Sequence, residues 1–406
     1  MSGIEVHQTV LANGLQLLGE VNRNNKSAAL GFFVKTGSRD EAQKESGVSH
    51  FLEHMMFKGT AKRNALELTF QMGNIGAQSN AFTSEENTVY YASIIPRRFA
   101  EMQEILCDML RPALDQQEFD TEKKVILEEI ALYQDRPQFY MFEKALGDFF
   151  GAHPAGNSVL GSAESISAVT RDEMADYFKR RYSPSNMVLT ASGNFDWQRF
   201  VADAEKYCSK WEDFRTERKL ARRTPGKVAK IYKRKNVKQT HVLMLADGCG
   251  AQDEERFAMT VLSTIIGDSS GSRLYWELID SGLADGAGSD SDEKDGVGCF
   301  MAYASTEPEK LDRVAEILRR IVSTPLEFSE GDLERARTKL CARIVLSGEL
   351  PLGRLMALGN EWNYNRRIHS LREVMERIKS VSRTDIENAV KRYPLRDWSE
   401  FRLVPE

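Results

Sequence analysis

The sequence predicts an α+β fold built from two homologous domains, and three observations lead to this prediction. The chain has 406 residues, which corresponds to two or three domains at about 150 residues each. Strand-like and helix-like segments are mixed without strict alternation, which favours α+β over a doubly wound parallel sheet. Two segments, one in each half of the chain, also resemble each other, as expected for a duplicated domain.

The repeat relates residues 164–181 to residues 376–393. The two segments read ESISAVTRDEMADYFKRR and ERIKSVSRTDIENAVKRY, and they align without a gap. Thr170 and Ser382 hold the same place before apolar residues at helical spacing, so both segments predict the same capped helix. A repeat whose period is half the chain is too long for a solenoid. It indicates two copies of one domain.

The boundary between the copies is predicted within residues 210–238. This stretch carries twelve Lys and Arg against three Asp and Glu, and it contains Pro225-Gly226, which favours an exposed linker. It has few aromatic residues and no motif that enters a nucleic-acid groove, so we expect a solvated connector. The predicted organisation is an N-terminal domain over 1–209, this basic linker, and a C-terminal domain over 239–406.

Local patterns place the main elements of the first copy. Runs rich in apolar and β-branched residues predict buried strands at 28–34 and 88–94, and apolar residues at helical spacing predict helices at 98–111 and 119–135. In the second copy, the acidic run 285–295 is expected to form a solvated loop or flap.

Composition excludes several classes of protein. A hydrophobic fraction of 41%, a charged fraction of 28% and a net charge of −5 are ordinary for a globular chain and unlike a disordered or collagen-like one. No apolar run approaches the ~20 residues that span a bilayer, and nothing calls for a nucleic-acid or membrane partner. Five scattered cysteines without a CxxC pair favour a reducing compartment. The N-terminus lacks the features of a signal peptide, so we expect a cytoplasmic protein, or a periplasmic or organellar one if a targeting segment was removed.

Residues 47–58, GVSHFLEHMMFK, contain the first candidate for chemistry. On a helix, Val48, Phe51 and their neighbours form a buried stripe, while His50, Glu53 and His54 share the adjacent face. Two imidazoles one turn apart can hold one metal ion, and the carboxylate between them can reach a water on that metal. A His pair filling the surface or core is the alternative, and this motif alone leaves both open.

A third metal ligand is expected on the later helix, in DTEKKVILEEIALYQDRP (120–137), which begins at an Asp or Thr cap. Glu122 and Glu129 lie two turns apart on one face, and Glu129 is flanked by apolar residues. A carboxylate in an apolar setting is costly unless it is paired or metal-bound. Glu128 stands over Lys124 and needs only a surface ion pair. Glu129 is therefore the better candidate.

The order of HxxEH at His50–His54 and then, after a long interval, Glu129 resembles the pitrilysin-type zinc metallopeptidases, the family of insulysin and the mitochondrial processing peptidase. The likeness covers most of the chain. It includes four further segments: TGSR at 36–39, FKGT at 57–60, NAFT and the following residues at 80–91, and YQDRP at 133–137.

This resemblance implies one Zn²⁺ per chain, held by His50, His54 and Glu129. It implies that Glu53 is the general base and that Glu122 belongs to the catalytic machinery, by orienting a metal-binding His or stabilising the site. Residues 79–83 resemble the family's edge strand, to which a peptide substrate adds as a further strand. The substrate-binding candidates there are listed together: Asn80, Ala81 and Phe82.

The resemblance also implies one active and one inactive half, closed on each other like a clamshell. Family members that act alone carry an Arg and a Tyr seven apart in the second half, where they help to bind substrate and to stabilise the oxyanion. Here the matching places hold Ile279 and Asp285, with one residue deleted, and Arg273 and Tyr275 have the wrong spacing. Half-length members of the family associate in pairs. We therefore expect a heterodimer with a homologous subunit that carries the Arg and Tyr, or otherwise a homodimer.

The expected function is a zinc-dependent endopeptidase that hydrolyses peptides or unfolded polypeptides in a closed chamber. Two alternatives stay open. One is a processing peptidase of narrow specificity for presequences, which needs acidic subsites, and Glu143 and Asp148 are weak candidates for them. The other is a non-catalytic structural subunit of the same fold, a role that requires neither HxxEH nor Glu129.

Overall fold

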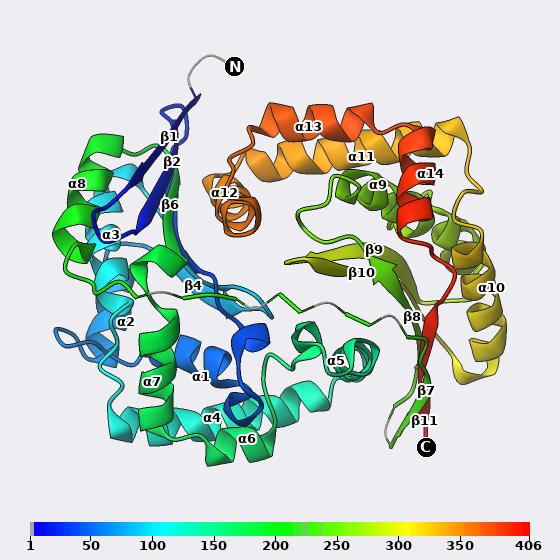
Figure 1. Cartoon of the computed structure of the whole chain (residues 1–406), viewed down its shortest axis with the longest axis horizontal. Helices are drawn as coiled ribbons and strands as arrows, with labels where there is room; N and C mark the ends of the chain where they lie inside the picture. The colour runs from blue at the N-terminus through cyan, green and yellow to red at the C-terminus, as the bar shows by residue number, and fades with distance from the viewer. Residues whose placement is uncertain (1–3, 215, 219, 222, 225, 236) are drawn as a thin grey trace. The chain divides into compact units, whose positions relative to one another are not determined.

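The computed structural model describes residues 4–406 except 215, 219, 222, 225 and 236, and it contains two compact units (Figure 1). The first unit comprises residues 1–131, 157–219 and 346–368, and the second comprises 132–156, 220–345 and 369–406. Two segments thus belong to the unit built mainly from the other half of the chain. The predicted domain boundaries at 209 and 239 stay a prediction.

The first unit is built on a six-stranded sheet in the order β1-β2-β6-β3-β5-β4. Strands β3 and β5 have the predicted bounds, and β4 lies at the edge of the sheet. The strands are β1 Ile4–Val10, β2 Gln16–Asn22, β3 Ala28–Val34, β4 Gln78–Thr83, β5 Thr88–Ile94 and β6 Met187–Gly193. The helices are α1 Val48–Met55, α2 Ala65–Asn74, α3 Phe99–Met109, α4 Gln116–Gln134, α6 Ala163–Ala168, α7 Arg171–Arg181, α8 Trp197–Cys208 and α12 Pro351–Asn365.

Helix α12 comes from the second half of the sequence but packs on the sheet of the first unit. In Figure 1 it is orange, whereas the sheet that it covers is blue to green. The close approach needs Gly359, because a Cβ there would lie 2.4 Å from the ring of Phe33 on β3. Arg354 of α12 donates two hydrogen bonds, of 2.8 and 2.6 Å, to the buried carboxylate of Glu20 on β2. The second half of the chain therefore completes the core of the first unit.

The second unit is built on a five-stranded sheet in the order β7-β11-β8-β10-β9. Helix α5, from the first half of the chain, packs on one face of it through Met141, Ala145 and Phe149. The strands are β7 Ala229–Arg234, β8 Thr240–Gly248, β9 Gly286–Lys294, β10 Val297–Thr306 and β11 Ser399–Pro405. The helices are α5 Pro137–Phe150, α9 Arg256–Gly267, α10 Leu311–Ser323, α11 Glu330–Gly348, α13 Leu371–Ser380 and α14 Arg383–Arg392.

The two units repeat one topology, which confirms the prediction of an α+β fold with two homologous domains. In the register of the repeat, which matches residue 164 with 376, β11 begins and ends at the equivalents of the two ends of β6. Helix α10 likewise begins at the equivalent of the first residue of α3. The predicted capped helices are α7 and α14: Thr170 accepts a hydrogen bond from the backbone N–H of Glu173, and Ser382 accepts one from that of Asp385.

Three local predictions are wrong in part. Helix α4 begins at Gln116 rather than at the predicted cap, because the Asp115 side chain accepts hydrogen bonds from the backbone N–H groups of Gln117 and Glu118. The acidic run 285–295 contains strand β9 instead of a loop, because its backbone pairs with β10 along its length and its charges alternate with small residues.

The basic linker also differs from a solvated connector. It contains β7, and the side chains of Arg218 and Arg223 are each only 4% exposed because they form ion pairs with Asp40 and Asp247, respectively. Pro225, in the predicted turn, lies outside the described residues.

Candidate metal centre

The short helix α1 is positioned at its N-terminus by a buried carboxylate. The backbone N–H groups of Gly47 and Ser49 donate hydrogen bonds of 2.7 Å each to Glu41, satisfying two of the free donors at the helix end. Gly47 has φ +91°, and a Cβ there would lie 2.5 Å from the carbonyl oxygen of Leu160, so only glycine fits. Burial raises the pKa of Glu41 to about 7, although both backbone hydrogen bonds act in the opposite direction.

Helix α4 is held against α1 by two buried aromatic rings. Phe51 of α1 stacks on Phe119 of α4 with ring centroids 4.7 Å apart, and both side chains are almost fully buried. One turn after Phe119, Glu122 is buried, and two turns further on Glu129 is partly buried, whereas Glu128 is exposed. The stacking thus directs two carboxylates of α4 toward the histidine-bearing face of α1.

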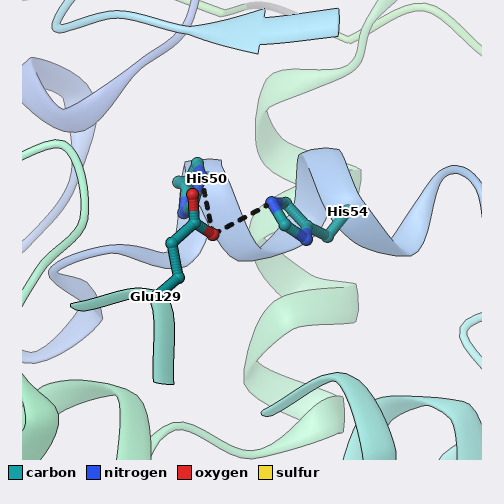
Figure 2. Close-up of side chains that lie close together, drawn as sticks. All are labelled: His50, His54 and Glu129. Atoms are coloured by element: carbon teal, nitrogen blue, oxygen red, sulfur yellow. Dashed lines mark ion pairs between the residues drawn. The ribbon is translucent and has the colours of Figure 1, made fainter. Parts of the chain in front are cut away.

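Three candidate ligands converge between these helices. One ligand atom each from His50, His54 and Glu129 lies within 4.8 Å of the others, and among the described residues this is the one such group of three (Figure 2). Glu129 Oε2 lies 3.8 Å from His50 Nε2 and 3.5 Å from His54 Nε2. In a tetrahedral site with bonds of about 2.0 Å, neighbouring donor atoms are about 3.3 Å apart, so the group needs little change to hold one ion.

The outer nitrogen of His54 is held by a second carboxylate. His54 Nδ1 donates a 2.8 Å hydrogen bond to Glu122 Oε1, which leaves the Nε2 lone pair directed at the group of three. Lys58 Nζ lies 2.5 Å from the other oxygen of Glu122 and balances its charge. A carboxylate behind a histidine in this way fixes the tautomer and orientation that a metal ligand needs.

Protonation of the two imidazoles differs. Burial, together with the nearby His54, lowers the pKa of His50 to about 3, so His50 is neutral at physiological pH. Burial also acts to lower the pKa of His54, but the hydrogen bond to Glu122 and the surrounding carboxylates raise it. The surroundings of the two candidate ligands thus shift their pKa values in opposite directions.

The donor set fits Zn²⁺. Two neutral imidazole nitrogens and one carboxylate oxygen, with a fourth position open, are a common ligand set of catalytic zinc. One observation of this structure agrees: the Nε2 atoms of both histidines face the same carboxylate oxygen, Glu129 Oε2. Burial keeps His50 neutral, so its Nε2 can act as a ligand. Unlike that of His54, the outer nitrogen of His50 has no hydrogen-bond partner among the described residues.

Glu53 lies between the two histidines and is held by one hydrogen bond. Thr83, the last residue of β4, donates a 2.7 Å hydrogen bond to Glu53 Oε2, which leaves Oε1 available. Burial raises the pKa of Glu53, which the Thr83 hydrogen bond and the charge of His54 partly offset. The residue has the position and the basicity of a group that takes a proton from water.

The predicted substrate-binding residues lie on the edge strand β4, which pairs with β5 on one side. Ala81 is on the same face as Thr83, while Asn80 and Phe82 alternate to the other face and are exposed. The Ala81 N–H donates a 2.9 Å hydrogen bond to the side chain of Asn80. Backbone groups of this edge can therefore pair with an added strand once the Asn80 side chain moves.

The second half carries other residues at the equivalent places. In the register of the repeat, His50 and His54 correspond to Leu262 and Ile266, both fully buried in the core. Arg273 is engaged with the carbonyl oxygen of Thr324, 2.6 Å away. Asp285 accepts a hydrogen bond from Gln239.

Comparison with known families agrees with this division. The family model described as insulinase (peptidase family M16) matches residues 17–163, and the model described as the peptidase M16 inactive domain matches residues 168–340. A protein of Mycobacterium bovis named an uncharacterized zinc protease is 33% identical over 399 residues, covering 96% of this chain and 90% of the relative. This chain belongs to peptidase family M16. The predicted likeness to half-length pitrilysin-type proteins is thereby confirmed.

Solved structures with the M16 fold resemble the whole chain. A protease from Helicobacter pylori superposes with a TM-score of 0.91 at 20% identity, covering 99% of this chain and 100% of the other. A chain of complex III2 from Candida albicans superposes with a TM-score of 0.87 at 17% identity, covering 98% and 96%. At these identities the likeness concerns the fold alone.

Several residues around the candidate metal centre had no role assigned from the sequence. Thr83 and Lys58 stand in the segments that carry the family resemblance, but their pairing with Glu53 and Glu122 depends on tertiary contacts. Glu41 and Phe119 carry no motif of their own. Phe119 could have been identified only as an apolar residue at helical spacing, which predicts that it packs against another element but not which one.

We expect Glu122→Gln to weaken zinc binding by about 10- to 100-fold, because a neutral amide holds the His54 tautomer less firmly than a carboxylate does. Competition with a chromogenic chelator measures the affinity. Glu128→Gln makes the same chemical change on an exposed part of α4 and should leave the affinity unchanged. Equal affinities for the wild type and Glu122→Gln would contradict the positioning role.

Glu41 should make stability depend on pH. Its folded pKa, about 7, lies above the ordinary value of 4.5, so between these values the folded chain holds a proton that the unfolded chain lacks. The contribution is present below pH 4.5, and the free energy of unfolding falls as pH rises through about 7. The full effect is about 3 kcal/mol.

Glu41→Gln should therefore flatten this decline in urea unfolding measured from pH 4.5 to 8. Glu128→Gln should show the wild-type slope. Parallel profiles for the wild type and Glu41→Gln would be inconsistent with a raised pKa at Glu41.

Proposed function

We propose that this chain is a zinc-dependent endopeptidase that hydrolyses peptides or unfolded polypeptides. The observation that carries the proposal is the convergence of His50, His54 and Glu129 beside the held carboxylate of Glu53. A histidine pair alone fits a structural metal site, but a structural site needs no buried base next to the metal. The name of the mycobacterial relative, a zinc protease, supports the same proposal.

The residues of the chain divide the work of hydrolysis. When bound, the zinc ion polarises a carbonyl group and acidifies a water molecule. Glu53 Oε1 accepts the proton of the attacking water, while Thr83 keeps the carboxylate in place. The same carboxyl group then returns the proton to the nitrogen of the leaving amine. Glu122 holds the ring of His54 throughout.

Edge strand β4 is the proposed site of substrate binding. A peptide that adds as a strand is recognised through its backbone and must be extended, which favours unfolded or short chains. Asn80, Ala81 and Phe82 would contact the peptide next to the bond that is cleaved. A hydrophobic peptide side chain could pack on Phe82, which is 38% exposed.

Of the two alternatives, the processing peptidase needs acidic subsites, and one of the two candidate residues for them already has partners within the chain. Asp148 is occupied by Lys230, at 2.5 Å, and by the hydroxyl of Tyr232, at 2.7 Å. The structural subunit is favoured only by the fold it shares with the chain of complex III2. The complete donor set and the Thr83–Glu53 hydrogen bond speak for catalysis.

We propose further that a homologous subunit completes the enzyme and helps to enclose its substrate. The places at which single-chain relatives carry an Arg and a Tyr hold Ile279 and Asp285 here. An aliphatic side chain and a carboxylate offer no hydrogen-bond donor to an oxyanion. The loss of such donors costs about 10²- to 10³-fold in rate.

The first test is cleavage of a quenched mixed-sequence peptide library by the zinc-loaded chain and by Glu53→Gln. The variant should bind zinc as the wild type does and cleave about 10²- to 10⁴-fold more slowly, because the proton acceptor is lost. Glu128→Gln is the matched control. A chain that binds no zinc would contradict the proposed function. A chain that binds zinc without turnover supports the need for a partner, and rapid turnover by the chain alone contradicts that need.

The partner is tested by purification from the native host. We expect a second chain of similar size at equal stoichiometry, with an Arg and a Tyr seven apart in its second half. Alanine at either of these should slow cleavage by the complex by about 10²- to 10³-fold. Purification of this chain with no companion of its size would rule out the heterodimer.

A further inference from the structure

The second unit contains a groove that plays no part in the proposed catalysis. A cavity of about 460 Å³ lies between edge strand β7, the neighbouring β11 and helix α10. Its floor is apolar, with Ile231, Met244 and Trp398 among its residues. Ile231 is 62% exposed, although it is a large aliphatic side chain on the face of the sheet that packs against α10, opposite α5.

The walls of this groove carry an excess of positive charge. Four cations line it against the single carboxylate of Glu400, and they are Lys227, Arg319, Arg396 and Arg402, whereas Lys230 pairs with Asp148 of α5. Glu400 is shared by two of them, since Arg319 and Arg402 lie 2.8 and 2.7 Å from its oxygens. Lys227 and Arg396 have no ion pair within the part of the chain that the structure describes.

The duplication shows what fills the same place in the first unit, namely helix α8. In the register of the repeat, Ile231 and Arg319 correspond to Gly19 and Cys107. Gly19 lies under the ring of Trp197, so close that a Cβ would meet the ring at 2.5 Å. Cys107 Sγ lies 3.5 Å from Cys208 Sγ, at the far end of α8.

A third pair of positions extends this match beyond the helix. Ser323, in the wall of the groove, corresponds to Arg111 of the first unit. The guanidinium of Arg111 lies 3.6 Å from the ring centroid of Trp211, which follows closely after α8. In the first unit, these positions contact α8 or its flank. In the described residues of the second unit no helix occupies the corresponding place, and the cavity remains there.

We propose that this groove binds an acidic amphipathic helix of a partner polypeptide. An apolar floor between charged walls suits a helix with one apolar face better than a small anion, and the same topology accommodates a helix in the first unit. The excess of cations selects acidic residues along the flanks of that helix. Opposite Ile231 the helix needs a small residue, because the isoleucine side chain takes the space that Gly19 leaves to Trp197.

The probe for this proposal is a labelled peptide with the sequence of residues 195–211, which contains three acidic and three basic residues. Both versions of the peptide have Trp197→Ala, to fit Ile231. The acidic version also has Arg199→Glu, Lys206→Glu and Lys210→Glu. Fluorescence anisotropy with the full chain should show binding of the acidic version at least about tenfold tighter than that of the other, and the difference should shrink with added salt.

The variant Lys227→Glu/Arg396→Glu should weaken binding of the acidic peptide by about tenfold or more. Neither side chain is in an ion pair among the described residues, so the fold should tolerate the change. The matched control is Arg23→Glu/Lys26→Glu, which reverses two exposed charges between β2 and β3 and should bind as the wild type does. Equal binding of both peptides, or equal binding by the two variants, overturns the proposal.

Orientation of the helix is tested by thiol exchange. In the first unit the residue equivalent to Arg319 is Cys107, which contacts Cys208. The acidic peptide is therefore prepared with its Cys208 in a mixed disulfide with 2-nitro-5-thiobenzoate, and the new thiol of the Arg319→Cys chain should attack the Cys208 sulfur. A new protein–peptide disulfide forms and 2-nitro-5-thiobenzoate leaves. The reaction should be at least about tenfold faster than with Arg372→Cys, a distant exposed position, because docking raises the local concentration. Equal rates would contradict a helix docked as α8 is.

Other occupants would also overturn the proposal. Calorimetric binding of tripolyphosphate, without binding of the acidic peptide, would assign the groove to a small anion. Self-association of the chain in sedimentation that is lost in Lys227→Glu/Arg396→Glu would assign it to a second copy. None of these measurements depends on zinc or on peptidase activity, so they are independent of the proposed function.

Discussion

The stacking of Phe51 on Phe119 is the contact on which the candidate metal centre depends. The ligands come from two helices far apart in the sequence, and within the part of the chain that the structure describes no backbone hydrogen bond joins α1 to α4. The two buried rings have centroids 4.7 Å apart. Successive residues of a helix are rotated by a fixed angle about its axis, so the position of Phe119 determines where the carboxylates of α4 meet the histidines. Glu41 orders the start of α1, and Thr83 connects its middle to β4. Hydrophobic packing sets the geometry, and the polar contacts then select the rotamers.

Much of this arrangement was predictable from the sequence because it depends on local periodicity. Strands β3 and β5 were placed at their true bounds, since short runs rich in apolar and β-branched residues favour strands. HxxEH on a helix places His50, Glu53 and His54 on one face whatever surrounds them. Glu129 was chosen over Glu128 on its apolar neighbours, and Glu128 is indeed exposed. The start of α4 was misplaced because Asp115, Asp120 and Thr121 are all competent caps, and Asp115 is the one whose side chain accepts hydrogen bonds from backbone N–H groups in the first turn of the helix.

What the sequence did not predict depends on long-range contacts. The pairing of Lys58 with Glu122 joins two distant segments of the sequence and has no periodic pattern. The exchange of α5 and α12 between the units also has no local pattern, because an amphipathic helix does not specify which sheet it covers. The strand β9 was predicted as a loop on its charge, yet an edge strand carries charge readily on its exposed side. Charge indicated solvent contact only in part, since Asp285 and Asp290 are exposed but Lys294 and Asp295 are buried, and it indicated the wrong secondary structure.

The duplicated unit explains why a half without metal ligands has kept its fold. Leu262, Ile266 and Cys341 stand where the first unit has His50, His54 and Glu129, so the same positions serve as core. The second half of the chain still supplies α12 to the first sheet, where Arg354 and Glu20 form a buried ion pair. Loss of one partner of such a pair costs about 3–5 kcal/mol, which constrains the second half of the chain through the stability of the first. The groove beside β7 is free of that constraint. There Ile231 and Arg319 stand at the places equivalent to Gly19 and Cys107. These positions are core in the first unit, whereas in the second they line a groove with charged walls. Such a surface is what the proposed docking of a separate polypeptide requires.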